Sequence, residues 1–311
     1  MPLSKETWRD RLAIPAIAAP MFLVSGPDLV VETCRSGLMG TFPALNQKTS
    51  EGYAAWLEEI QERLGAAASP FGVNLIVHKT NGRLARDVEI TVQHRVPVVI
   101  TSLGAVRDVV DAIHSYGGVV FHDVINLRHA NKAAEAGVDG LIAVCAGAGG
   151  HAGLLNPFAF VAEIRRMFDK TLILSGAITN GRQIAAAQLM GADLAYLGTR
   201  FINTRESLAP AGYKEMIMAS TARDIVYTPA ISGVAGNFLR ASMVAAGADP
   251  DNLQSSVKLD MSSEHEAKAW KDVWSAGQGV GDIEDVLPAA ELCRRLIAEY
   301  REAISGLTHL V

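Results

Sequence analysis

Short apolar runs recur along the chain at intervals of roughly 20 to 30 residues, and stretches with helical period lie between them. The runs are rich in Val, Ile and Leu and mostly do not alternate with polar residues, which is typical of strands buried on both faces. They predict strands at residues 14–21, 38–42, 71–76, 96–101, 118–124, 140–145, 171–175 and 194–198.

The amphipathic stretches between these runs predict helices at residues 28–36, 51–64, 106–114, 127–136, 157–168 and 181–190. Several of them end at a glycine, namely Gly37, Gly137 and Gly191. Glycine just past a helix end is the expected left-handed cap. Strands and helices therefore alternate regularly as far as the eighth apolar run.

Eight strand–helix units in series predict an α/β fold with a parallel sheet, and eight is the number of strands that closes a (β/α)8 barrel. An open doubly wound sheet is the alternative, but no G-x-G-x-x-G sequence opens the first helix. We therefore predict a TIM barrel.

The regular alternation breaks after Phe201. Residues 205–285 hold scattered helical patches and two loops, 228–237 and 274–281, before a last helix near residues 286–304. An insertion between the eighth strand and the eighth helix of a barrel lies over its C-terminal mouth. We predict a barrel domain of residues 1–204 and 286–311, capped by a small, mainly helical lid segment of residues 205–285.

Composition narrows the class of protein. Of the 311 residues 49% are hydrophobic, and 28 Lys and Arg against 33 Asp and Glu give a net charge of −5 without a basic stripe, which argues against nucleic-acid binding. The first eight residues contain no apolar signal core, and no apolar run is long enough to span a membrane. The three cysteines show no paired framework. We predict a soluble, cytoplasmic protein that does not bind membranes.

Chemistry in a TIM barrel collects at the C-terminal ends of the strands. Here the seventh and eighth strands end in Ser175-Gly176-Ala177 and Gly198-Thr199. Small residues that lead into helix N-termini expose backbone N–H groups to an anion, and two hydroxyl groups add donors. Small residues also suit tight turns, but their place after both of these strands favours a phosphate site.

The sixth strand runs into a glycine-rich loop, residues 146–153, whose one ionisable side chain is His151. Backbone without Cβ atoms lets a flat ligand approach closely, and an imidazole is suited to moving a proton near neutral pH. The alternative interpretation is a glycine-rich turn with a surface histidine. Together with the phosphate site, the loop suggests a phosphorylated cofactor that supplies the difficult chemistry itself.

Other kinds of site find less support. His122-Asp123 is the nearest candidate for a metal site, but the histidines come from different units with no ligand pattern. No G-x-S-x-G elbow is present. Cys145 borders the glycine-rich loop, and a cysteine on a buried strand is usually an inert small hydrophobe. We predict no metal.

Motifs at the first, third, sixth, seventh and eighth strands, and one loop late in the chain, stand in an order that is specific when taken together. They are Ala18-Ala19-Pro20-Met21, Gly72-Val73-Asn74-Leu75, Ala148-Gly149-Gly150-His151, Ser175-Gly176-Ala177, Gly191-Ala192-Asp193 with Gly198-Thr199-Arg200-Phe201, and Trp274-Ser275-Ala276-Gly277-Gln278-Gly279. These motifs resemble those of the nitronate monooxygenase family, formerly called 2-nitropropane dioxygenases. The resemblance spans nearly the whole chain.

The resemblance implies FMN on a TIM barrel. It places Met21 beside the isoalloxazine ring with its backbone as the contact, and Asn74 at the polar edge of the flavin or its ribityl chain. It implies that Gly149 and Gly150 let the backbone approach the cofactor. The remaining residues that it implies for cofactor binding are Ser175, Gly176, Ala177, Gly198 and Thr199 around the phosphate, and Gln278 from the lid segment.

His151 matches the position of the catalytic histidine of the family. The resemblance implies that it acts as general base towards the acidic C–H of a nitroalkane, or orients a nitronate that is already ionised. Flavin then takes an electron and O2 reoxidises it, so that the products are a carbonyl compound and nitrite. The implied partners are this small-molecule substrate and O2.

Two positions depart from the family pattern. Many relatives carry a lysine near the end of the fifth strand, where this chain has His122-Asp123. A carboxylate in place of an ammonium changes the local charge and any hydrogen bond to the cofactor. The loop of residues 232–237 also lacks a proline that is often seen there.

Other functions fit the same scaffold. The chain also resembles FMN-dependent NAD(P)H:quinone reductases and enoyl-thioester reductases, in which a histidine can donate a proton to the reduced product. A flavin-free barrel acting on a sugar phosphate needs a lysine or a carboxylate pair, and only Asp123 offers itself. A protein that binds FMN without turnover has no need of His151. A homodimer stays open, because apolar faces on barrel helices often support one.

Overall fold

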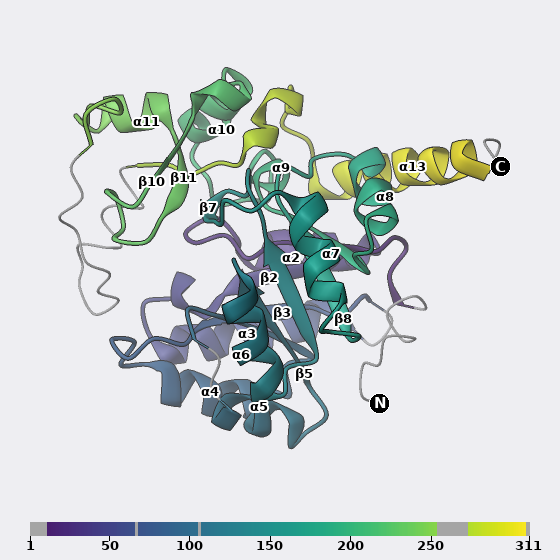
Figure 1. Ribbon diagram of the computed structural model, residues 1–311. Coiled ribbons are helices and arrows are strands. Elements are labelled where there is room, and N and C mark those ends of the chain that lie inside the picture. The colour runs from purple at the N-terminus through teal and green to yellow at the C-terminus, as the bar shows by residue number, and fades with distance from the viewer. Residues whose placement is uncertain (1–10, 66–67, 105–106, 254–272, 309–311) are drawn as a thin grey trace.

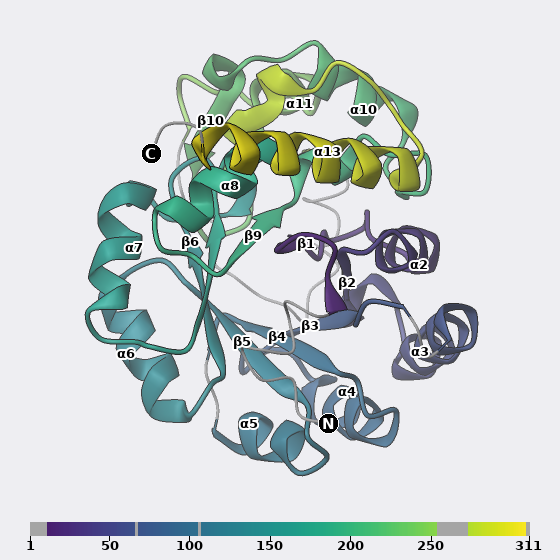
Figure 2. The ribbon, with the colours of Figure 1, turned by 90° about the vertical axis from the view of Figure 1, so that its right-hand side faces the viewer.

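Parallel strands form the centre of the molecule and close into a barrel (Figures 1 and 2). The computed structural model describes residues 11–65, 68–104, 107–253 and 273–308. The barrel strands follow one another in chain order, and the last pairs with the first, which confirms the predicted (β/α)8 barrel. They are β1 (Ala16–Ala18), β2 (Met39–Pro43), β3 (Gly72–Ile76), β4 (Val98–Ser102), β5 (Val119–Val124), β6 (Gly140–Val144), β8 (Thr171–Ser175) and β9 (Leu194–Leu197).

Side chains on the barrel strands alternate between the barrel interior and the surrounding helices. On β5, Phe121 packs inside with Ile100 and Ile142, whereas Val120 belongs to the larger core beneath the helices. The predicted strands are almost continuously apolar because both of their faces are covered. The same alternation decides which polar side chain at a strand end points into the barrel.

Helices surround the barrel and cover its outer face (Figure 2). They are α2 (Pro27–Arg35), α3 (Ser50–Leu64), α4 (Leu84–Gln93), α5 (Arg107–His114), α6 (Leu127–Ala136), α7 (Pro157–Arg165), α8 (Gly181–Leu189) and α13 (Ala289–Thr308). Asn126 caps α6 by accepting the N–H of His129, and the helix ends at Gly137 with φ 90°, as its sequence predicts. Val106, the first residue of the helix predicted at 106–114, lies outside the described residues.

Between β9 and α13 the chain leaves the barrel and builds a separate layer at one end of it (Figure 1). Its strands β10 (Ile225–Thr228) and β11 (Gly236–Leu239) form an antiparallel hairpin, and β11 also pairs with β7 (Gly150–His151) from the glycine-rich loop. This sheet was not predicted, since its third strand is two residues of a distant loop. The other elements here are α9 (Thr199–Ile202), α10 (Ala211–Met218), η2 (Ala222–Asp224), α11 (Arg240–Ala245) and η3 (Gln278–Asp282). Residues 254–272 of the lid segment lie outside the described residues.

Across the described ranges, none of the helices combines the length and the apolar character that crossing a membrane requires. The longest, α13, instead packs along α8 and α2 on the outside of the barrel. Its apolar side chains Leu292 and Leu296 join the core between helices and strands.

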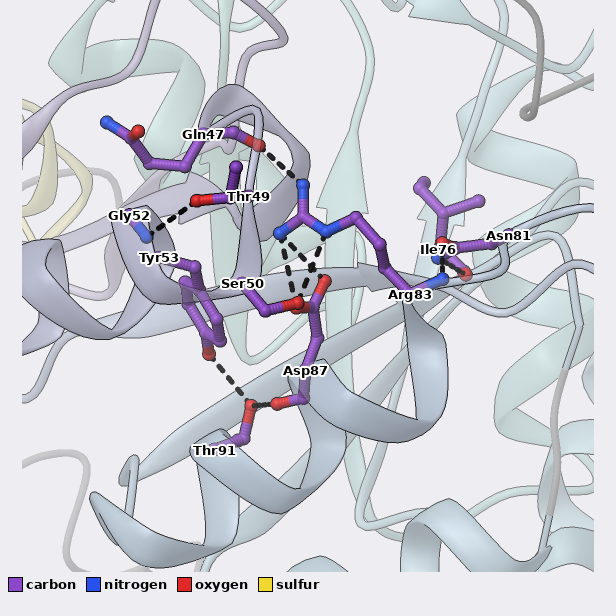
Figure 3. A network of polar contacts seen from close by, with 10 residues as sticks. All are labelled: Gln47, Thr49, Ser50, Gly52, Tyr53, Ile76, Asn81, Arg83, Asp87 and Thr91. Carbon is purple, nitrogen blue, oxygen red and sulfur yellow. Dashed lines mark hydrogen bonds and ion pairs between the residues drawn. The ribbon is translucent and has the colours of Figure 1, made fainter.

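A polar network joins the start of α3 to α4 (Figure 3). The Asp87 carboxylate, whose side chain is 2% exposed, accepts a hydrogen bond from Ser50 Oγ at 2.6 Å and pairs with Arg83 at 3.1 Å. Arg83 Nη1 in turn donates to the backbone oxygen of Gln47 at 2.5 Å. The buried charge is therefore fully paired, and the guanidinium fixes the connection between β2 and α3.

Candidate active site

Asn74, Ser102 and Asp123 form a row of hydrogen bonds across β3, β4 and β5 at the C-terminal end of the barrel. Asn74 Nδ2 donates to Ser102 Oγ at 2.7 Å, and Ser102 donates in turn to Asp123 Oδ2 at 2.5 Å. Asp123 is in register with Ile142, a residue of the barrel interior, so its side chain faces inward as well. Every donor in the row points towards Asp123.

Asp123 ends this row with one oxygen unmatched. Its Oδ1 atom is buried and has no hydrogen-bond partner among the described residues. Burial raises the pKa of Asp123 to about 6, against the opposing effect of the hydrogen bond from Ser102. Near neutral pH this carboxyl group therefore lies close to the balance between its protonated and ionised forms.

Asn74 presents an acceptor to the mouth of the barrel. Its two amide hydrogens are already used, one by Ser102 Oγ and the other by the backbone oxygen of Ile100 at 3.2 Å. Only an NH2 group can donate to a carbonyl oxygen, which fixes the orientation of the amide and leaves Oδ1 to accept. The hydrogen bond that Asn74 can offer a ligand is therefore one to an N–H or O–H group.

His122 lies on the opposite face of β5 from Asp123. Its Nδ1 atom is 2.8 Å from Thr101 Oγ1, and both residues are buried. Burial lowers the pKa of His122 to about 4, so the ring is neutral at pH 7. His122 and Asp123, although adjacent in sequence, therefore lie on opposite faces of β5. In the ranges that the structure describes, no three His, Cys, Asp or Glu side chains gather where a metal ion could be held.

The glycine-rich loop after β6 packs against the last part of the lid segment. A Cβ atom on Gly149 would stand 2.8 Å from the backbone nitrogen of Gly277, and that nitrogen donates to Thr199 Oγ1 at 2.8 Å. Glycine at position 149 is therefore required by this close approach of two backbones. Gly150, by contrast, has φ 70° and no atom within 4 Å of the place of a Cβ, so the space on that side of its backbone is open.

His151 is held between this loop and the lid segment. It lies opposite Gly236 in the pairing of β7 with β11, and its Nε2 atom is 3.2 Å from Ser232 Oγ. The Ser232 hydroxyl also lies 3.1 Å from the backbone oxygen of Val234. When the hydroxyl donates to that oxygen, Nε2 carries the ring proton and Nδ1 is the basic nitrogen. Burial lowers the pKa of His151 to about 4. The imidazole is therefore neutral at pH 7 and able to accept a proton.

The turn after β8 has a strained backbone. Gly176 (φ 145°) and Ala177 (φ 52°) both adopt conformations that L side chains rarely take, and for an alanine this costs roughly 1–2 kcal/mol. The lid segment braces the end of this turn, where Thr179 Oγ1 and Asn180 Nδ2 both donate to Asp282 Oδ2, at 2.6 and 2.8 Å. Strain that the surroundings hold in place is typical of a ligand-binding turn.

The turn after β9 is the second place predicted for an anion. A Cβ atom on Gly198 would meet only one side-chain atom, at 3.8 Å, so this backbone is open to a ligand. Thr199 Oγ1 accepts the N–H of Gly277, which leaves its hydroxyl hydrogen to donate. Gln278 is exposed, and its N–H donates to the backbone oxygen of Gly147 at 2.9 Å. The lid segment thus comes down onto both the glycine-rich loop and this turn.

Met21, after β1, is fixed through its backbone. Its N–H donates to Ser25 Oγ at 3.0 Å, and its carbonyl oxygen accepts from Asn46 Nδ2 at 3.1 Å. Asn46 is the last residue of η1 (Ala44–Asn46), next to the Gln47 carbonyl that the network of Figure 3 holds. Both backbone polar atoms of Met21 are therefore engaged within the protein, and its side chain packs against two apolar clusters. The predicted contact of its backbone with the flavin stays a prediction.

The structure thus brings the predicted residues of the sixth, seventh and eighth strand ends together with Gln278, and it places Asn74 in a row across the barrel. The sequence did not lead us to pair Ser102 with Asp123. Counting alternate residues from Phe121 would have predicted that Asp123 faces the barrel interior. Ser232 and Asn46 come from distant loops, and no local pattern points to them.

The resemblance to known proteins extends along the chain. Residues 80–299 match the family model described as nitronate monooxygenase. The chain is 26% identical to the nitronate monooxygenase of Paraburkholderia phytofirmans, in a match that covers 94% of each protein. At this identity the shared length, rather than any single motif, makes the relationship clear.

Solved structures give the same picture. The chain is similar to the nitroalkane oxidase from Streptomyces ansochromogenes, with a TM-score of 0.84 and 25% identity over 98% of this chain and all of that one. FabK from Thermotoga maritima has the same fold, with a TM-score of 0.82 and 22% identity over the full length of both chains. Since the family model covers most of its length, the chain belongs to the nitronate monooxygenase family of flavin-dependent oxidoreductases.

Proposed function

We propose that the protein uses FMN to oxidise alkyl nitronates and nitroalkanes with O2, giving a carbonyl compound and nitrite. The position of His151 carries this proposal. Burial keeps its ring neutral, its Nε2 atom contacts Ser232, and the residue lies at the edge of the glycine-rich loop. Membership of the family supports the substrate class.

The residues at the barrel mouth fit a flavin. Asn74 offers an acceptor for a ring N–H, and the backbone is open at Gly150 and Gly198. The strained turn at Gly176 and the hydroxyl group of Thr199 suit a phosphate. Ser175 precedes the strained backbone of this turn and Ala177 is part of it, and Gln278 of the lid segment is bonded through its N–H to Gly147. When bound, FMN supplies the electron acceptor that these side chains lack.

His151 has a different task for each substrate. A neutral nitroalkane must lose the proton on the carbon beside its nitro group, and the basic Nδ1 atom of His151 accepts it. A nitronate has already lost that proton, so only the orientation of the substrate is left to the histidine. The contact of Nε2 with Ser232 orients the ring, so that its other nitrogen, Nδ1, is the one that contacts the substrate.

We also propose that residues 205–285 cap this site as a lid over the barrel domain of residues 1–204 and 286–311. The contacts of β11 with β7, and of Gly277 with Thr199, support this division. A capped site excludes water from the reacting groups. A homodimer and a cytoplasmic location stay predictions, to be checked by light scattering and by cell fractionation.

The first test is the flavin itself. The purified protein should be yellow and release FMN on denaturation, as identified by chromatography against FMN and riboflavin standards. Anaerobic addition of an alkyl nitronate should then reduce the flavin. Bleaching by NADH or NADPH in the absence of any nitro compound would instead favour the reductase interpretation.

The second test separates the base from the scaffold. His151→Asn should keep FMN bound and lower kcat/KM for a neutral nitroalkane by about 10²- to 10⁴-fold, with a much smaller loss for the nitronate. The matched control is His129→Asn, which removes an exposed histidine on α6 and should leave both values unchanged. An equal loss on the two substrates would contradict the role of His151 as a base.

A further inference from the structure

We propose that Asp123 takes up a proton when the flavin binds and donates a hydrogen bond from its Oδ1 atom to an acceptor atom of the ring. This inference rests on the proposed function, since it needs a flavin at the barrel mouth. It goes beyond that function because it assigns a donor, and a coupled proton, to a residue that His151 chemistry does not use.

The direction of the hydrogen bonds carries the first step. Asn74 donates to Ser102, and Ser102 donates to Oδ2 of Asp123. Oδ2 therefore already accepts a short hydrogen bond, and a proton added to the carboxyl group belongs on the other oxygen. A protonated carboxyl group has one O–H donor, so Oδ1 becomes the donor at the end of the row.

The burial of Oδ1 carries the second step. This atom is shielded from solvent and has no hydrogen-bond partner among the described residues. A ring seated over the strand ends removes more water from the carboxyl group, and an ionised oxygen left unpaired there is costly. Protonation removes that cost and turns the unmatched acceptor into a matched donor.

None of the described groups that face Asp123 is a cation that could pair with its carboxylate. Ser102 on β4 and Asn74 on β3 do not titrate, and Val144, the last residue of β6, lies in the apolar interior cluster. Tyr196 on β9 feels the charge of Asp123, but burial holds the pKa of this phenol well above its usual range. His122, the titratable neighbour on β5 itself, faces the outside of the barrel beside Thr101.

The consequence is a linkage between pH and flavin affinity. Since the pKa of Asp123 is about 6 before the ring covers it, binding above pH 6 must take up a proton from solution. The Kd for FMN should then rise by up to about tenfold for each pH unit above 6. An asparagine at this position offers an N–H donor at every pH and should show no such rise.

The experiment compares the full-length holoenzyme with Asp123→Asn between pH 5.5 and 8.5. Each protein is diluted at each pH, and the fluorescence of released FMN gives the Kd. The ratio of the wild-type Kd to the Asp123→Asn Kd should be flat below pH 6 and climb towards tenfold per pH unit above it. The FMN phosphate, with its second pKa of about 6, titrates in both proteins and cancels in the ratio.

A second variant keeps the test independent of how Asp123→Asn folds. Ser102→Ala removes the hydrogen bond that lowers the pKa of Asp123, so the pH at which the Kd begins to rise should move upward. If the row had only a structural role, Ser102→Ala would weaken FMN binding equally at every pH.

The possible failures are distinguishable. A Kd ratio that stays constant across the pH range, or a rise that begins at the same pH in Ser102→Ala, would overturn the inference about Asp123 and leave the proposed function intact. Absence of FMN binding by the wild-type protein at every pH would instead overturn the proposed function, and the inference with it.

Discussion

Two polar networks at the C-terminal end of the barrel differ in how they end. The network around Asp87 closes on itself, because the carboxylate receives Ser50 and Arg83, and Arg83 goes on to a backbone oxygen (Figure 3). The row from Asn74 through Ser102 runs in one direction and stops at a buried oxygen of Asp123 that nothing matches. The first carboxyl group belongs to helix α4 and the second to strand β5.

This difference indicates that the Asp87 network has a structural role and that the row ending at Asp123 belongs to a ligand site. A buried charge whose donors are all supplied by the protein is expensive to disturb, because removing one partner leaves the others unpaired. A buried acceptor that the protein leaves unmatched costs stability in the isolated chain, and such a cost is expected where a ligand completes the hydrogen bonds. The two carboxyl groups should therefore respond in opposite directions to the same substitution.

The largest effect is expected at the closed network. Asp87→Asn removes the buried charge that pairs with Arg83, whose side chain is 25% exposed. It should lower the free energy of unfolding by about 3 kcal/mol, measured by urea denaturation at pH 7. FMN affinity, per folded molecule, should change little. A loss below about 1 kcal/mol would mean that solvent already screens this ion pair.

The same substitution at the open row should stabilise the flavin-free protein. The pKa of Asp123 rises from 3.8 to about 6 on folding, so ionisation costs stability as the pH passes from 4 to 6, and the whole cost is present at pH 8. Asp123→Asn should therefore raise the free energy of unfolding at pH 8 by about 2 to 3 kcal/mol. Most of this gain should vanish at pH 4, and a gain independent of pH would have another cause.

His122, on the other face of the same strand, has a pKa that burial shifts in the opposite direction to that of Asp123. Its folded pKa of about 4 lies below the ordinary 6.5, so its contribution to stability is present above pH 6.5 and is lost as the pH falls towards 4. As the pH falls from 7 to 5, the free energy of unfolding of His122→Leu should decrease by about 2 kcal/mol less than that of the wild type. Parallel stability curves for the two proteins would show that this histidine keeps an ordinary pKa.

The smallest effect is expected at an exposed pair on α4. Arg86 and Glu89 lie 2.9 Å apart, and their side chains are 53% and 62% exposed. Arg86→Ala should change the free energy of unfolding by less than about 0.5 kcal/mol, which makes it the control for Asp87→Asn on the same helix. A large loss would place Arg86 in the buried network after all.

Much of the barrel could be predicted because its signals are local. Each strand is an apolar run of Val, Ile and Leu, and the glycines just past helix ends indicate the C-terminal caps of helices such as α6. The glycine-rich loop with His151 was also visible, since its composition is unusual over a few residues. The sheet of β10, β11 and β7 was missed because its pairing joins segments far apart in the chain.

The order of strands and helices, the closure expected of eight units, and the histidine beside a glycine-rich turn follow from the sequence alone, because each depends on neighbouring residues. That Asn74, Ser102 and Asp123 form one row, that Ser232 contacts His151, and that position 149 must be glycine could be seen only in the folded protein. Those properties depend on partners from other strands and from the lid segment, and a hydrogen-bond partner or an approaching backbone is fixed only when distant segments meet.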